Sequence, residues 1–528
     1  MEKQTVDQKG VFQQLKQFWK PDLLAGFMVF LLALPLSLGI AKASGFPASM
    51  GVLSAIIGGL ATIFFKVSEL SIKGPAAGLI TISAAAMTEF GGGEQAWHIV
   101  SAVVVVMAVL QILTGIFKFG SLSDFFPHSA VHGMLAAIGI IIILKQIPVL
   151  LGDAPSLFAG EGPIELFLDF PEFVLHAHWH IAVIGIIGLI ILFIFPTIKS
   201  KIIKNIPAPL VVLLVAVPLT IYWHFDQTEP EYSLVEIGDF WGSIGFNVDF
   251  SLIGTFTFWK YVLMFYFVSS LESLLTVKAI DTMDPEKRMS DANGDITGQG
   301  GGNGIAGLIG GIPMISEVVR SSANVKFNAK TRWSNFFHGL FLLLAMIFLI
   351  PIIELIPNSA LAALLIYAGY NLTSPKHYID AFKVGKEQFL IFIITVVVTL
   401  AEDLLLGIAC GIVVKIIIEI FYGVKFKSLL KARFNLEENK DSLTIHVEGA
   451  AIFSNLMKYK KTINENIGKK RLIVDFSKAH YIDHSFMSYI AYVEQEHEKE
   501  EFEIVGMENY TSLSKHPLSA RRNKNLKE

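Results

Sequence analysis

The chain has 528 residues, of which 53% are hydrophobic, and its formal net charge at pH 7 is −4. Many apolar runs of about 20 residues exclude a soluble globular protein and indicate a polytopic membrane protein. The single cysteine, Cys410, lies in one of these runs and excludes a disulfide framework.

Residues 1–21 are polar and charged and lack a signal-peptide pattern, so we expect them in the cytoplasm. From residue 22 to residue 422, hydropathy predicts an α-helical membrane domain of about fourteen spans. The spans are expected at 22–42, 48–66, 74–89, 97–118, 122–146, 178–196, 206–223, 257–281, 292–310, 313–326, 331–356, 358–373, 386–401 and 402–422. The third, tenth and twelfth are short.

Loop charges support this count, because Lys and Arg gather in cytoplasmic loops. With the N-terminus inside, every even-numbered span exits into a basic segment. The two long loops on the other side, 147–177 and 224–256, contain no Lys or Arg. We therefore expect both termini in the cytoplasm and a multi-pass protein of the cell membrane, in bacteria the inner membrane.

Spans three and ten both begin at a glycine and a proline, at Gly74-Pro75 and at Gly311-Ile312-Pro313. Proline is favoured at the first position of a helix, so both prolines predict helix starts. These helices are too short to cross the bilayer, so their starts should lie at its middle. The topology directs one helix outward and the other inward, and seven spans separate them. This arrangement predicts a 7+7 inverted repeat.

Glycine- or proline-interrupted short spans in both halves of a chain indicate the binding site of a transporter. Helix N-termini present free N–H groups and a positive dipole end, which bind anions. We therefore expect an anion between the two helix starts. The expected substrate-binding residues are Gly74, Pro75, Ala76, Ala77, Pro313, Met314, Ile315, Ser316 and Arg320.

Charged residues near these starts predict how transport is coupled. Arg320 lies seven residues into helix ten, where it can meet the anion or pair with Glu317 one turn earlier. Lys73 should pair with Glu317 or Glu272, because an unmatched buried charge is unfavourable. Glu272 lies within span eight and is either a proton relay or a structural tie. Coupling to protons rather than sodium is expected.

After residue 422 the composition changes. Residues 423–440 form a basic and then acidic linker, and residues 441–510 alternate strands and helices in the manner of a small cytoplasmic α/β domain. Strands are expected at 442–447, 472–476 and 502–505, and helices near 454–467 and 484–497. Residues 511–528 are a basic tail.

The most specific motifs are Ser270-Leu271-Glu272-Ser273-Leu274-Leu275-Thr276-Val277-Lys278-Ala279, Asn293-Gly294, Gly298-Gln299-Gly300, Gly311-Ile312-Pro313 and Arg320-Ser321-Ser322-Ala323-Asn324. Through them nearly the whole chain resembles the sulfate permease (SulP) family of anion transporters. The run from Ile473 to Ser485 is similar to the STAS domain that ends such chains.

The resemblance implies a core domain of spans 1–4 and 8–11, a gate domain of spans 5–7 and 12–14, elevator-like motion and a homodimer. It also implies that a cation site of sodium-coupled relatives lies near Lys73, whose ammonium would replace the ion. Some STAS relatives carry a phosphorylatable hydroxyl at the position of Ser485, but His484 and Phe486 depart from their pattern and favour a docking or dimer role.

The sequence therefore predicts a secondary active transporter for a small inorganic oxyanion, bicarbonate or sulfate. Two alternatives are a carrier of a dicarboxylate or nucleobase on the same fold and a non-transporting membrane sensor that signals through the STAS-like domain. No nucleotide-binding loop or hydrolase motif is present, so neither an enzyme nor a primary pump is expected. No cofactor, metal or nucleic-acid partner is expected.

Overall fold

The computed structural model describes residues 11–120, 127–153, 161–199, 206–286, 288–402, 404–439, 441–467, 471–496 and 501–523. These residues fall into two compact units, one within 1–120 and 138–372 and the other within 121–137 and 373–528. The expected division into core and gate spans is a different one and stays a prediction.

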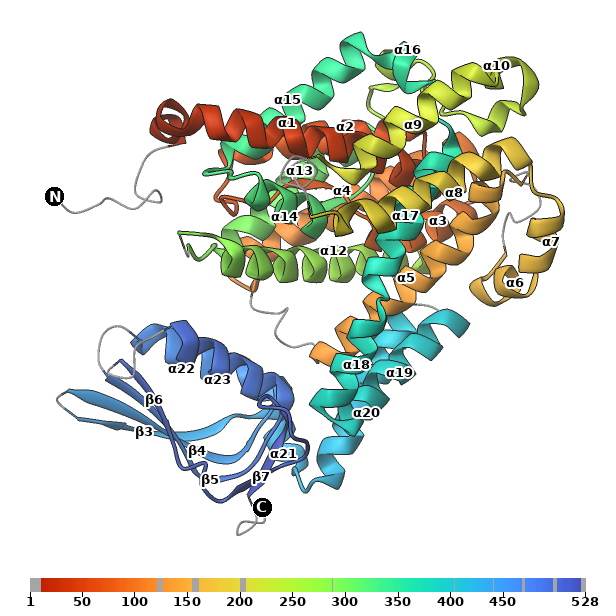
Figure 1. The fold of residues 1–528 in the computed structure, drawn as a ribbon. Coiled ribbons are helices and arrows are strands. Elements are labelled where there is room, and N and C mark those ends of the chain that lie inside the picture. Colours follow the sequence, from red (N-terminus) through yellow and green to blue (C-terminus); the bar gives the residue numbers. More distant parts are fainter. Residues whose placement is uncertain are drawn as a thin grey trace. The chain divides into compact units, whose positions relative to one another are not determined.

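The first unit is built of helices, and Figure 1 traces them in chain order. They are α1 (Val11–Ala43), α2 (Ala48–Leu60), α3 (Ile80–Glu89), α4 (Gly93–Ile116), α5 (His128–Leu151, which enters both units), α6 (Pro163–Leu168), α7 (Phe170–Leu175), α8 (Trp179–Ile194), α9 (Ala208–Tyr222), α10 (Phe225–Thr228), α11 (Phe240–Ser243), α12 (Phe256–Met283), α13 (Ala292–Leu308), α14 (Val318–Lys326), α15 (Trp333–Phe348), α16 (Ile350–Ile353) and α17 (Asn358–Leu372).

The second unit contains the last membrane helices and a mixed sheet. Its helices are α18 (Pro375–Val384), α19 (Lys386–Ala401), α20 (Leu404–Phe421), α21 (Phe426–Leu430), α22 (Leu456–Asn466) and α23 (His484–Glu496). Its strands are β3 (Arg433–Glu438), β4 (Ser442–Ala451), β5 (Arg471–Ile482), β6 (Phe502–Val505), β7 (Tyr510–Ser512) and β8 (Arg521–Asn523).

Each of the fourteen expected spans overlaps a helix, and the first residues of the fifth span, 122–126, lie outside the described part of the chain. In the described part of the chain, six helices are long and apolar enough to cross a membrane by themselves: α1, α4, α5, α8, α12 and α20. Helix α1 begins at Val11, well before the expected residue 22. Its first turns are held by Trp333, whose indole N–H donates to the carbonyl of Val11 at 2.8 Å, and by Gln14, which bonds to Glu69.

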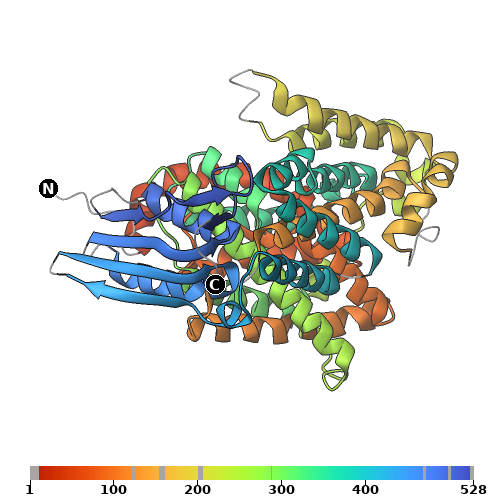
Figure 2. The ribbon, with the colours of Figure 1, turned by 90° about the horizontal axis from the view of Figure 1, so that it is seen from below.

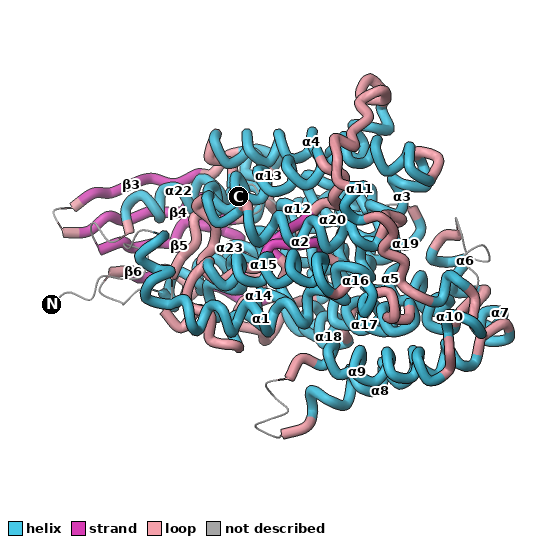
Figure 3. The backbone as a smooth tube through the Cα atoms, turned by 90° about the horizontal axis from the view of Figure 1, so that it is seen from above, coloured by secondary structure: helices cyan, strands magenta, loops and turns pink. Residues whose placement is uncertain are grey.

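The predicted helix starts at Pro75 and Pro313 are wrong. Residues Lys73–Pro75 form strand β1, a 3₁₀ turn (Ala77–Leu79) follows, and α3 begins only at Ile80. Residues Met314–Ser316 form strand β2, and α14 begins at Val318. The two strands pair with each other, which satisfies backbone groups that a longer helix would have satisfied internally. Figure 3 shows this short pair in magenta among the helices.

Helix α13 is rich in glycine yet regular, because it packs tightly against α4. A Cβ atom at Gly300 would lie only 2.9 Å from the carbonyl oxygen of Ala108 on α4. Glycine normally weakens a helix, so this close approach is the physical reason for its presence here. The tight packing fixes α13 as a rigid support for strand β2, which follows it.

The sheet of the second unit has the order β3-β4-β5-β8-β7, with β6 also paired to β5 (Figure 2). Strands β4, β5 and β6 are parallel, and β3 and β8 are antiparallel to their neighbours. Leu443, Ile445 and Val447 alternate along β4 and enter a core that β5, α22 and α23 complete. This is the expected STAS-like α/β arrangement.

Two predicted boundaries of this domain are wrong. The expected linker 423–440 contains α21 and β3, because β3 pairs with β4 along its whole length. The expected tail 511–528 contributes β8, whose Arg521 and Arg522 pair with the end of β5. In the sequence, a basic strand at the end of the chain has the same composition as a solvated tail. Only its pairing with another strand distinguishes the strand from a tail. Residues 524–528 lie outside the described part.

Candidate functional site

The two interrupted segments meet, as predicted. Strands β1 and β2 pair antiparallel, with Lys73 opposite Ser316, Gly74 opposite Ile315 and Pro75 opposite Met314. All six of these residues are buried. Because each strand leads into its own short helix and the strands run in opposite directions, α3 and α14 leave the crossing in opposite directions. This crossing is the centre of the candidate site.

The N-terminus of α14 keeps fewer free donors than predicted: among its first three residues in the described structure, only the N–H of Val318 has no partner. The side chain of Glu317 caps the helix by accepting from the N–H groups of Val319 and Arg320 at 3.1 and 2.7 Å. The N–H groups before the helix are also engaged: Met314 donates to Asn303, Ser316 to Ser273 and Glu317 to Ile72. An anion therefore cannot use these backbone groups without displacing a protein partner.

The start of α3 is different. In the described part of the chain, the N–H groups of Ala77 and Gly78 have no hydrogen-bond partner. The hydroxyl of Thr81, one turn later, is buried and also lacks one. Glycine at 78 leaves room for the carboxylate of Glu272, which a Cβ atom there would overlap. The start of α3 therefore offers more free donors than the start of α14, where the N–H of Val318 is without a partner in the described structure.

Arg320 is the most unusual side chain of the site. It is completely buried, and among the described residues none of its three guanidinium nitrogens has a hydrogen-bond partner. Its nearest carboxylate is Glu317, whose Oε2 lies 3.9 Å from Nε. The guanidinium lies against β1 at Gly74, where a Cβ atom would overlap it. A buried cation without bonded partners is unfavourable unless a ligand supplies them.

Lys73 pairs with neither Glu317 nor Glu272, so that hypothesis is wrong. Its ammonium lies 2.6 Å from Oδ2 and 2.7 Å from Oδ1 of Asp295 on α13, and it also bonds to the hydroxyl of Ser316. Both charged side chains are completely buried. The loop before β1 enters beside the first turn of α13, which brings Lys73 to Asp295 rather than to α12 or α14. Ser316 is thereby engaged and is not a free donor.

Glu272, on α12, remains without a cation. It is 8% exposed, its Oε1 has no hydrogen-bond partner, and in the described part of the chain neither Lys73 nor Arg320 forms an ion pair with it. Of the four charged residues named in the sequence analysis, Arg320 and Glu317 are neighbours, Glu272 lies at the start of α3, and Lys73 is paired with Asp295.

Four functional candidates escaped the sequence analysis. Asp295, Gln299 and Asn303 follow one another at a spacing of four on α13, and each bonds to the crossing. That spacing places them on one helix face and was a detectable signal. His338, on α15, is completely buried within electrostatic range of Arg320, and neither of its ring nitrogens has a partner in the described structure. Nothing in its local sequence distinguishes it.

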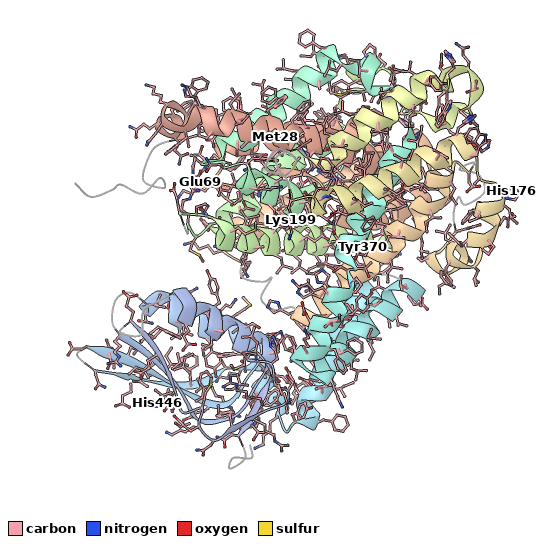
Figure 4. The ribbon with its side chains drawn as sticks, in the orientation of Figure 1. Met28, Glu69, His176, Lys199, Tyr370 and His446 are labelled. Carbon is pink, nitrogen blue, oxygen red and sulfur yellow. The ribbon has the colours of Figure 1, made fainter. Side chains whose placement is uncertain are left out.

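A cavity of about 320 Å³ lies beside this crossing rather than within it. It opens between the end of α12, the start of α13 and the segment after α2. Its walls contain two ion pairs, Arg288 with Asp284 and Arg332 with Glu69. Glu69 is labelled in Figure 4. Ser68, also on its wall, donates its N–H to Asp295 at 2.9 Å.

In the second unit, Lys415 and Glu419 on α20 form an ion pair at 3.2 Å, and Lys415 also forms one with Asp483 at 3.1 Å. All three side chains are at most 1% exposed. Asp483 lies just before α23 and accepts from the N–H groups of Phe453 and Phe486. We call the contact of Lys415, Glu419 and Asp483 between α20 and the sheet the joint. Ser485, the hydroxyl considered for regulation, follows Asp483 by two residues and is 4% exposed.

In the described part of the chain, many apolar helices surround two interrupted segments that cross beside a buried guanidinium without a hydrogen-bond partner. This is the architecture of a secondary transporter. Comparison with known proteins identifies the family of transporters to which the chain belongs. The sequence profile of the Sulfate permease family matches residues 19–395, so the chain belongs to this family of transporters and is not an enzyme.

The chain is similar to YvdB of Bacillus subtilis (strain 168), with 25% identity over 491 residues that cover 89% of this chain and 88% of YvdB. It is 24% identical to the bicarbonate transporter BicA of Picosynechococcus sp. over 405 residues, covering 74% and 69% of the two chains. Its fold is similar to that of the murine anion transporter Slc26a9 in the inward-facing state, with a TM-score of 0.69, 16% identity and coverage of 94% and 87%.

Proposed function

We propose that this chain carries a small inorganic oxyanion, bicarbonate or sulfate, across the cell membrane, and that a proton moves with it. The observation that carries the proposal is Arg320, whose buried guanidinium has no hydrogen-bond partner in the described structure. An oxyanion would accept from its planar fork of donors and from the free N–H groups of Ala77 and Gly78.

Charge balance supports proton coupling. Lys73 is neutralised by Asp295, and Glu317 lies beside Arg320 while it caps α14. Glu272 then remains as an extra carboxylate at the start of α3, where an anion would bind. An ionised Glu272 would repel that anion inside a medium of low dielectric constant. Binding therefore favours the protonated carboxyl, so one proton enters with the anion and leaves with it.

The ammonium of Lys73 supplies a positive charge at the crossing, the role that an inorganic cation would otherwise have. Sodium is therefore not required in this proposal. Movement follows from the position of the site: an anion held on β1, α3 and α14 has to be exposed to the two membrane faces in turn. We infer an elevator-type motion of the elements that hold it, with the homodimer as the working assembly.

The decisive experiment is uptake into proteoliposomes that contain the purified chain. Labelled sulfate, bicarbonate and fumarate are each supplied while the pH gradient and the sodium concentration are varied independently. We expect accumulation of sulfate or bicarbonate that increases with an inward proton gradient and is unaffected by sodium. Accumulation that requires sodium and ignores pH would contradict proton coupling. Uptake of fumarate alone would mean that the site binds an organic acid instead of an inorganic oxyanion.

A further inference from the structure

The crossing is supported from one side by a row of polar side chains on α13. Asp295, Gln299 and Asn303 are four residues apart, so they lie on one face of the helix. All three are completely buried. Such a buried polar row on a glycine-rich helix has to be satisfied by its neighbours, and all three side chains bond to the pair β1–β2.

Strand β2 is held by several neutral hydrogen bonds. Asn303 donates to the carbonyl of Met314 and accepts from its N–H, at 3.1 and 2.8 Å. Gln299 donates to the same carbonyl at 3.2 Å, and Ser273 on α12 accepts from the N–H of Ser316 at 3.0 Å. Loss of any one bond leaves the others, so the place of β2 does not depend on a single group.

Strand β1 depends on fewer contacts. At its N-terminal end, Lys73 is held by its side chain on Asp295 and by its backbone N–H on Asn335, at 3.2 Å. Asp295 accepts from three segments: from Ser68 before β1, from Lys73 in β1 and, at 3.5 Å, from Ser316 in β2. Asp295 thus bonds to both strands and to the segment that leads into β1.

We propose that Asp295 is a positioning residue of the transport site, which sets the spacing of β1 and β2 and thereby the place of Arg320 relative to the N-terminus of α3. Arg320 lies against Gly74, the residue after Lys73, so a shift of β1 changes the site directly. The inference rests on the proposed function, because anion transport is one of its two readouts.

The first test compares single and double variants of the full chain in proteoliposomes. Asp295→Asn leaves a buried ammonium without its counter-charge and is expected to lower the midpoint of thermal unfolding and to reduce uptake more than about tenfold. Lys73→Met combined with Asp295→Leu removes both charges, and this double variant should regain the wild-type midpoint. Its KM should stay about tenfold higher, because β1 is no longer held in register.

A second variant keeps the ion pair. Ser316→Ala removes the hydroxyl that both charged groups share, and we expect normal unfolding with a KM about threefold higher, the effect of one lost hydrogen bond. Asp291→Asn, an exposed carboxylate at the start of the same helix, is the matched control and should match the wild type. A wild-type KM in both the double variant and Ser316→Ala would overturn the inference.

The unfolding measurement separates this inference from the proposed function. If the wild-type chain took up no anion, the proposed function would fail, yet Asp295→Asn should still unfold early and the double variant should recover. An Asp295→Asn chain that unfolds at the wild-type midpoint would instead overturn the inference, whatever the wild-type chain transports.

Discussion

Arg320 is the residue on which the proposed anion site depends most directly. Its side chain is buried on all sides, and its partners in the described structure are limited to a carboxylate 3.9 Å away that is already bonded to two backbone N–H groups. Arginine keeps its charge when it is buried, because its guanidinium is a much stronger base than the other ionisable side chains. The positive charge is therefore available to a ligand and cannot be relieved by loss of the proton.

Arg320→Gln should raise the KM for the transported anion about thirtyfold, the effect of removing a hydrogen bond to a charged group. Saturable binding, measured by isothermal titration of the purified protein, should weaken by a similar factor. Lys326→Gln removes a positive charge from the exposed end of the same helix and serves as the control. Equal effects of the two substitutions would mean that only the general potential matters, and not the guanidinium.

Glu272 governs coupling in the proposal. Glu272→Gln imitates the protonated carboxyl, so it should abolish accumulation driven by a pH gradient while leaving assembly in the membrane intact. Exchange of anion across equal concentrations should persist, because the neutral site can still bind. Glu286→Gln, an exposed carboxylate just after α12, is the control. If Glu272→Gln accumulated anion in response to pH as the wild type does, another group would have to carry the proton.

At the scale of an element, the start of α3 suits the proposed anion site because no large side chain covers its backbone. Ala76, Ala77 and Gly78 carry no side chain large enough to cover the backbone, and the carboxylate of Glu272 lies where a Cβ atom of residue 78 would be. The same absence of bulk at Gly74 admits the guanidinium of Arg320. Two glycines four residues apart thus allow two charged side chains to approach one short segment.

Gly78→Ala is expected to push Glu272 out of this position and to reduce uptake more than about tenfold, with a loss of about 1–3 kcal/mol in stability from overpacking. Uptake assays and thermal unfolding of the same preparation would check both effects. Gly254→Ala is the matched control, because a Cβ atom there meets no atom within 4 Å. Normal transport by Gly78→Ala would show that Glu272 is not confined at the helix start.

The edge of the C-terminal sheet contains a pH-dependent link. His446 on β4 (labelled in Figure 4) bonds to Asp475 on β5 at 2.8 Å and to Glu437 on β3 at 3.0 Å. These hydrogen bonds, that to Asp475 first, raise the pKa of His446 above its usual value. A raised pKa in the folded state means that the stabilisation is complete below the unfolded value of about 6.5 and is lost as pH rises through the folded value.

We therefore expect β3 to open more readily as pH rises from about 6 to about 8. Hydrogen exchange of peptides from β3 and β4 in the full chain, corrected for intrinsic rates, would measure this opening. His446→Gln should remove the pH dependence and leave the exchange rate similar to that of the wild type at high pH. The same pH response in the variant would assign the effect to another group.

At the scale of the whole molecule, the joint between α20 and the C-terminal sheet is a packed one. Lys415 is enclosed by Glu419 and Asp483, and its ammonium lies 5.9 Å from the centre of the Phe453 ring. Tyr422 at the end of α20 stacks on Tyr481 of β5 with ring centres 5.6 Å apart. The last membrane helix and the STAS-like domain are therefore joined by buried charged and aromatic contacts, and Ser485, two residues after Asp483, is buried as well.

Lys415→Met should open this joint, because it leaves two buried carboxylates without a cation at a cost of about 3–5 kcal/mol. Faster tryptic cleavage within residues 425–431 of the full chain would report the opening. Glu419→Gln retains a balanced pair of Lys415 and Asp483 and should be cleaved as slowly as the wild type. Lys478→Met, at an exposed position of β5 outside the cleaved segment, controls for the loss of a lysine. Equal cleavage of Lys415→Met and wild type would contradict a charge-dependent joint.

The sequence by itself determined the number and order of the membrane helices, the meeting of the two glycine-proline segments and the presence of a C-terminal α/β domain. These features follow from local signals: runs of apolar residues, loop charge, helix-breaking residues and alternation along strands. Even so, Pro75 and Pro313 were misread as helix starts, because strand pairing between residues more than 200 positions apart leaves no local signal.

Only the tertiary structure decided which charges meet. Asp295 rather than Glu272 or Glu317 neutralises Lys73, Glu317 caps its own helix, and Asp483 joins Lys415 and Glu419. Each outcome depends on distances of a few ångströms between elements far apart in the chain, and electrostatic energy in a buried site changes steeply over such distances. Arg320 is left without a bonded partner for the same reason, since packing placed each candidate carboxylate elsewhere or just out of reach.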